Sequence, residues 1–106
     1  MYEYIKGIIK EVTPTFIVVE NNGIGYFIHI SLNSYAQFND KNEACVFIQE
    51  IIREDAHFLF GFYDKKERDI FNHLISVSGV GANTARVMLS SLSPDEIQRA
   101  IMQNNV

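Results

Sequence analysis

Hydrophobic residues alternate with polar ones over much of the first sixty positions, which is the pattern of β-strands. The isoleucine-rich run Tyr4–Val12 predicts a strand that ends where Pro14 blocks a ladder. A β-branched run over 16–20 predicts a second strand, followed by Asn21-Asn22-Gly23, residue types that tolerate the positive φ of a tight turn. Apolar residues at every second position of 24–30 predict a third strand with one buried face.

A polar stretch separates these strands from two more. Residues 31–43 are rich in Asn and Asp, and we expect a loop with one helical turn around 35–38. After this stretch, apolar residues again alternate with other residues in two runs separated by a break at 53–56. The first run contains Val46, Ile48 and Ile52, and the second contains Phe58, Phe60 and Phe62. The phenylalanines could stack on bases, but aromatic residues at this period are usually core, and we interpret them so. Five short strands suit a small barrel of the oligonucleotide/oligosaccharide-binding (OB) type.

The apolar period becomes helical from Asp64 onward. Asp64 and Glu67 have the spacing of a capping box, and the helix they open stops at Ser78-Gly79-Val80-Gly81. A second helix is predicted from about Ala82. A third opens at Ser93-Pro94, a cap followed by a proline in the first helical position. The apolar faces of the three helices are Ile70, Phe71, Leu74 and Ile75; Ala85, Met88, Leu89 and Leu92; and Ile97, Ala100 and Ile101.

The glycine hairpin, Gly79-Val80-Gly81, is the most informative motif of the helical half. Two glycines one residue apart allow a sharp turn, and we expect Val80 between them to point inward. The next helix would then present its unpaired N–H groups as an anion site, for which a DNA phosphate is one candidate. A helix-hairpin-helix uses this geometry to hold the DNA backbone without reading bases. On spacing alone, an ordinary tight turn between helices explains the motif equally well.

The break at Arg53-Glu54-Asp55-Ala56 predicts an acidic hairpin tip. Exposed acidic side chains at such a tip usually interact only with solvent and have no further function. The functional alternative is that the acidic tip, Glu54 and Asp55, repels phosphates and pushes two duplexes apart. Catalysis or metal binding by this pair has no support, because no third ligand of matching character lies nearby in the sequence.

Composition narrows the class of protein. The 106 residues are 47% hydrophobic and carry a net charge of −4, so nucleic-acid binding would depend on local geometry and not on bulk charge. No apolar run approaches the roughly 20 residues of a membrane span, and no signal sequence is evident, so we expect a cytoplasmic protein. We expect Cys45 to be a small buried residue, and His29 and His57 to lie on the surface. These three residues and His73 lack metal-site spacing, and no P-loop occurs, so we expect no metal, cofactor or catalytic set.

Taken together, these motifs resemble the RuvA family, the Holliday-junction-binding subunits of the bacterial branch-migration machine. The resemblance runs in register along the whole chain. Its matching stretches are Gly7-Ile8-Ile9, Gly23-Ile24-Gly25-Tyr26, Arg53-Glu54-Asp55-Ala56, Gly61-Phe62 leading into Glu67-Arg68, Gly79-Val80-Gly81 and Ser91-Leu92-Ser93.

The resemblance implies an OB barrel over residues 1–62 and, over 63–106, the first half of a helix-hairpin-helix domain. It also implies a non-catalytic subunit of recombination and DNA repair, acting in the response to DNA damage. That subunit would bind four-way junction DNA as a homotetramer or octamer, and the full-length protein would serve the ATP-driven RuvB motor. Glu54 and Asp55 would form an acidic pin at the crossover. The DNA-binding hairpin would comprise Gly79, Val80, Gly81, Ala82, Asn83, Thr84 and Arg86.

Two departures from the family pattern change these expectations. Asn83 stands where family members often carry lysine, so the phosphate contact is expected to be weaker or shifted to Arg86. The chain also stops at Val106, before a second glycine hairpin and a third domain, so we expect an N-terminal fragment with reduced DNA affinity and no RuvB binding. The competing interpretation is an OB barrel that serves as an oligomerisation or protein-interaction module without a DNA role.

Overall fold

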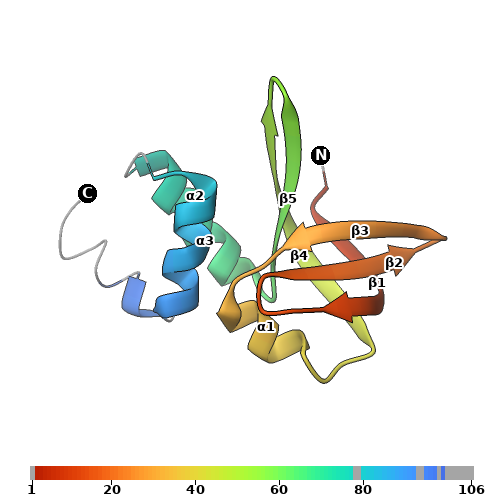
Figure 1. Ribbon diagram of the computed structural model, residues 1–106. Helices are drawn as coiled ribbons and strands as arrows, with labels where there is room; N and C mark the ends of the chain where they lie inside the picture. The colour runs from red at the N-terminus through yellow and green to blue at the C-terminus, as the bar shows by residue number, and fades with distance from the viewer. Residues whose placement is uncertain (1, 78–79, 93–94, 98, 100–106) are drawn as a thin grey trace.

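A computed structural model describes residues 2–77, 80–92, 95–97 and 99. Five strands form a closed barrel with the spatial order β1-β2-β3-β5-β4, and α2 and α3 lie beside it (Figure 1). Residues 95–97 and 99 are also helical, whereas the predicted cap at Ser93-Pro94 falls outside the described residues. The elements are β1 (Tyr4–Val12), β2 (Phe16–Asn21), β3 (Ile24–His29), α1 (Leu32–Phe38), β4 (Glu43–Arg53), β5 (Ala56–Phe62), α2 (Lys65–Val77) and α3 (Ala82–Ser91).

The predicted five-stranded OB barrel followed by helices is therefore confirmed. All strand pairs are antiparallel except β3 and β5, which close the barrel through a parallel pairing at His29 and Phe60. Asn22 and Gly23 adopt φ angles of 52° and 81°, so the hairpin between β2 and β3 turns where the sequence predicts.

The interior of the barrel is mainly aliphatic, and it is packed closely against Gly61. A Cβ added to Gly61 would lie 2.4 Å from both Ile28 Cγ2 and Val46 Cγ1, so only glycine lets β5 pass this close to its neighbours. The buried residues of this core are Ile5, Ile17, Val19, Ile28, Ile30, Phe38, Ala44, Val46 and Ile48.

A second hydrophobic core joins the barrel to the helices. Phe60 and Phe62 flank Gly61 in β5 and point away from the barrel interior, where Phe60 stacks on Phe71 of α2 and Phe62 contacts the same ring at a tilt. The prediction of a phenylalanine core is thus confirmed for these two residues. It is wrong for Phe58, which lies nearer the hairpin tip and remains 37% exposed. The buried members of the second core are Phe60, Phe62, Ile70, Phe71, Leu74, Ala82, Ala85, Leu89 and Ile97.

Three smaller predictions are also corrected. The helical turn expected around 35–38 is longer and spans Leu32–Phe38, because Ser31 Oγ caps it by accepting from the Ser34 amide at 3.2 Å. Cys45 is exposed, because its neighbours Ala44 and Val46 take the inward positions of β4.

His29 is half-buried and does not lie freely on the surface, because its ring packs among aromatic residues of β3 and β5. Burial lowers the pKa of His29, and the nearby Arg86 adds to the shift. His57 is exposed, as predicted, and its Nε2 lies 2.9 Å from Glu50 Oε2.

Candidate nucleic-acid interface

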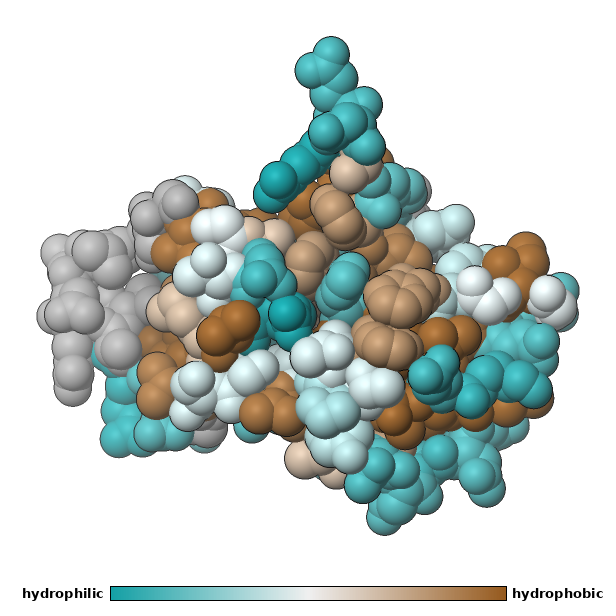
Figure 2. All heavy atoms as spheres, viewed as in Figure 1, coloured by the Kyte–Doolittle hydropathy of each residue, from teal (hydrophilic) through white to brown (hydrophobic). Residues whose placement is uncertain are grey.

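Glu54 and Asp55 form the two-residue turn of the β4–β5 hairpin. The last strand pair before the turn is Arg53 with Ala56, and both carboxylates are exposed. Within the described part of the chain, neither carboxylate has an ion-pair partner. The hairpin stands clear of the barrel, and Figure 2 shows its hydrophilic end above a more apolar surface. The predicted acidic tip therefore presents two unneutralised charges to solvent.

The glycine hairpin leads directly into α3. Gly79 falls outside the described residues, whereas Val80 is half-buried and packs against the second core, as predicted. Gly81 is the N-cap of α3 at φ −67° and ψ 156°, so it contributes no side chain to cap the helix. A Cβ built on Gly81 meets nothing within 4 Å among the described residues. The amides of the first turn therefore begin at an uncovered end of α3.

The side chains of the first turn of α3 differ in accessibility. Ala82 is buried, whereas Asn83 and Thr84 are exposed. Arg86 points back along the helix: its Nε and Nη2 donate to Asn83 Oδ1 at 3.2 and 2.7 Å, and its Nη1 donates to the Ile30 carbonyl at 3.2 Å. Desolvation lowers the pKa of Arg86. Three of the five guanidinium N–H groups thus have protein partners.

The acidic tip and the N-terminus of α3 belong to one packed unit. β5 begins beside the tip, and its far end, Phe60 and Phe62, is buried in the same core as Ala82 and Ala85 of α3. A groove separates the hairpin from α3, and its lining includes Arg53 from the hairpin and Asn83 from the helix. The hairpin that carries the acidic tip and the first turn of α3 therefore line one groove, whose lining does not include Glu54 or Asp55 themselves.

Comparison with known proteins identifies this arrangement. The model of the RuvA N-terminal domain family matches residues 1–61. The chain belongs to the RuvA family. It is 55% identical over 105 residues to the Holliday junction branch migration complex subunit RuvA of Parabacteroides distasonis. The aligned residues cover 99% of this chain and 54% of that protein. It is 51% identical over 105 residues to the subunit of the same name from Bacteroides fragilis, covering 99% of this chain and 52% of that protein.

The match extends beyond the barrel that the family model covers. The RuvA subunit of Flavobacterium psychrophilum is 45% identical over 106 residues, which is 100% of this chain and 55% of that protein. The chain thus spans about half the length of the curated RuvA relatives it matches.

Sequence reasoning missed a buried carboxylate at the joint between the barrel and the helices of this RuvA chain. Asp64 Oδ1 accepts from the Glu67 amide at 2.9 Å, which is half of the predicted capping box. The Glu67 carboxylate turns instead to α1, where it accepts from Ser31 Oγ at 2.7 Å and from Ser34 Oγ at 2.6 Å. Burial raises the pKa of Glu67, although the two serine hydrogen bonds oppose the shift.

A signal for this contact exists in the sequence. Glu67 stands three and four residues before Ile70 and Phe71, and so lies on the apolar face of α2 and not on its solvated side. A carboxylate in that position predicts a buried hydrogen-bonding partner.

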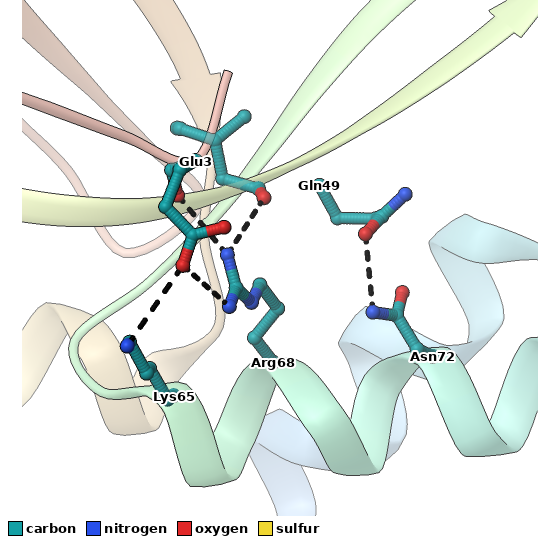
Figure 3. Close-up of polar contacts among 6 residues, drawn as sticks. Glu3, Gln49, Lys65, Arg68 and Asn72 are labelled. Atoms are coloured by element: carbon teal, nitrogen blue, oxygen red, sulfur yellow. Dashed lines mark hydrogen bonds and ion pairs between the residues drawn. The ribbon is translucent and has the colours of Figure 1, made fainter. Parts of the chain in front are cut away.

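Arg68, the next residue, fastens a second side of α2 to the barrel (Figure 3). Its Nη1 donates to the carbonyls of Glu3 and Ile48 at 3.0 and 3.4 Å, and its Nη2 donates to Glu3 Oε2 at 3.0 Å. The hydrogen bond from Arg68 is the largest cause of a lowered pKa of Glu3. One turn further along α2, Asn72 donates to Gln49 Oε1 of β4 at 3.0 Å. These bonds fix the helix relative to the strand that carries the acidic tip.

The described residues contain no group of three or more metal-ligating side chains. None of the described helices is long and apolar enough to cross a bilayer.

Proposed function

We propose that this chain binds four-way Holliday junction DNA and holds it open for branch migration. In this role it is a non-catalytic subunit, and ATP hydrolysis occurs on a separate RuvB motor. The proposal places the protein in recombination and DNA repair in the cytoplasm. Its support is family membership over the whole chain together with the groove that is lined by the hairpin carrying the acidic tip and by the first turn of α3.

Each element has a distinct task in this proposal. The first turn of α3 holds a phosphate of one DNA arm through backbone amides, which requires no sequence-specific side chain. Because Arg86 already donates to Ile30 and Asn83, it reaches phosphate with its remaining N–H groups. The acidic tip repels phosphates at the crossover and so separates strands while disfavouring plain duplex. The residues assigned to the hairpin are Gly79, Val80, Gly81, Ala82, Asn83, Thr84 and Arg86.

The proposed organisation has two parts and a symmetric assembly. Residues 1–62 form the barrel domain, and residues 63–106 contribute the first helix-hairpin-helix half of a DNA-binding domain. A homotetramer, or an octamer built from two tetramers, would bring one acidic tip per subunit to the crossover. We assign RuvB contact to the third domain of the full-length protein and not to these residues.

A competition assay tests this function. A labelled four-way junction is bound to the protein and displaced with unlabelled junction or with duplex of equal length, over a series of salt concentrations. We expect junction to compete far better than duplex, and affinity to fall steeply with salt because bound phosphates release counterions. Equal competition by the two DNAs would contradict the proposal. Self-association without DNA binding would favour a pure oligomerisation module.

A further inference from the structure

Five consecutive residues at the end of β3 and the start of α1 join the barrel to the parts around it. We call this stretch the 30–34 segment. Each of its residues makes at least one hydrogen bond to α2 or to α3. The segment itself is part of the barrel domain, because Ile30 is fully buried in the barrel core and Ser31 caps α1.

Three members of the segment hold α3. The Ile30 carbonyl accepts from Arg86 Nη1 at 3.2 Å, and the Leu32 amide donates to Ser90 Oγ at 3.0 Å. Asn33 Nδ2 donates to the carbonyl of Leu89 and, at 2.9 Å, to that of Leu92. Carbonyls in the last turn of a helix lack partners within the helix, so Asn33 caps α3 from outside.

The other two members hold α2 and the end of β5. Ser31 and Ser34 donate to the two oxygens of Glu67, and Ser34 Oγ also accepts from the Tyr63 amide at 3.0 Å. Tyr63 directly follows β5, the strand that begins beside the acidic tip. The 30–34 segment is therefore hydrogen-bonded to α2, to α3 and to the residue that follows β5.

We propose that Asn33 is a positioning residue that sets the placement of α3 relative to the acidic tip, and thereby the preference for four-way DNA over duplex. The preference needs both elements at one spacing, since a single duplex engages α3 without meeting the tip. Of the three residues that hold α3, Ile30 and Leu32 use backbone atoms, and Asn33 uses its side chain, whose one amide group supplies both bonds. The inference concerning DNA preference rests on the proposed function, whereas the inference concerning placement does not.

A distance measurement tests the placement without DNA. Spin labels are attached to Ile52→Cys on the hairpin and Val87→Cys on α3, both at exposed positions, in a Cys45→Ser background that removes the exposed native thiol. We expect one narrow distance distribution in the parent and a broadened or shifted one in Asn33→Ala and Asn33→Asp. Gln37→Ala, an exposed amide one turn along α1, is the matched control and should match the parent.

A binding measurement tests the consequence. In the unlabelled protein, Asn33→Ala is expected to weaken junction binding about tenfold, the scale of one or two lost hydrogen bonds, with duplex affinity almost unchanged. A purely structural role would weaken both DNAs equally. Ser90→Ala replaces Asn33→Ala if that variant does not fold, with the same shift expected in milder form, because it removes the acceptor for the Leu32 amide together with a bond to the Arg86 carbonyl inside α3.

Each remaining outcome decides the inference. An unchanged distance distribution in the Asn33 variants overturns the positioning role. A changed distribution with an unchanged junction-to-duplex ratio overturns the link to DNA preference. If the parent itself shows no junction preference, the proposed function fails and the link to DNA preference falls with it, while the distance distributions still decide whether Asn33 positions α3.

Discussion

Gly61 lies so close to Ile28 of the neighbouring strand β3 that a single added carbon would be 2.4 Å from Ile28 Cγ2. We expect Gly61→Ala to lower the free energy of unfolding by about 1–3 kcal/mol, because overpacking displaces strand β5. Chemical denaturation measures the loss. Gly25→Ala is the matched control, since its Cβ would meet Val18 Cγ1 at an ordinary 3.6 Å. Equal stability of Gly61→Ala and the parent would show that β5 has room to move.

The pH dependence of stability should reveal Glu67. Its pKa is raised in the folded protein, so the stability gained by protonating it is fully present below 4.5, the ordinary value, and is lost as pH rises through the folded pKa. Glu67→Gln keeps the shape of the side chain and removes the loss of stability that accompanies ionisation. We therefore expect the variant to gain stability relative to the parent as pH rises from about 4.5 to 7. Asp69→Asn, at an exposed position of the same helix, serves as control, and a constant Glu67→Gln difference across this range would contradict the raised pKa.

Charge reversal should expose the role of the acidic tip. In the proposed function, Glu54→Lys with Asp55→Lys strengthens duplex binding and reduces the preference for junctions, because repulsion of phosphates becomes attraction. The measurement is the ratio of the two dissociation constants at fixed salt. Glu11→Lys with Asp40→Lys changes the net charge equally at exposed positions elsewhere and should raise affinity for both DNAs without changing their ratio. An unchanged ratio in the tip variant would argue against the pin role.

Arg68 should contribute more to stability than its neighbour Lys65, although both approach Glu3. We expect Arg68→Ala to cost about 1–3 kcal/mol of unfolding free energy, because it leaves the carbonyls of Glu3 and Ile48 without this donor. Lys65→Ala should cost less than about 1 kcal/mol, because its exposed ion pair spans 3.9 Å. Thermal unfolding of both variants provides the comparison, and equal losses would show that the backbone contacts of Arg68 add little.

Local signals in the sequence were sufficient for the barrel strands and the turn between β2 and β3. Isoleucine-rich and β-branched runs located the first two strands, alternation located the other three, and Asn22-Gly23 supplied the positive φ angles that the hairpin requires. The start of α3 at Ala82 followed from the glycine that precedes it. Each of these features depends on residues close together in the chain, which is why pattern alone could predict it.

Features that depend on distant residues were not predictable in the same way. Alternation identified Phe60 and Phe62 as buried residues. It did not show that they belong to the second core and not to the barrel core, because the helices that cover them come later in the chain. The short helix α1 is stabilised by its cap at Ser31 and by packing against α3, and its own apolar pattern is weak. Asn33 gave no signal at all, since its partners Leu89 and Leu92 lie more than fifty residues away.

The alternation of faces along β5 limits how this protein can change over evolutionary time. Inserting or deleting one residue between the turn and Phe60 would exchange the two faces, forcing phenylalanine rings into the barrel and offering glycine to the helices. Each strand of the hairpin can therefore gain or lose residues only two at a time, so descendants of this gene can lengthen or shorten the arm that carries the acids in steps of about 7 Å, with two residues changed in both strands.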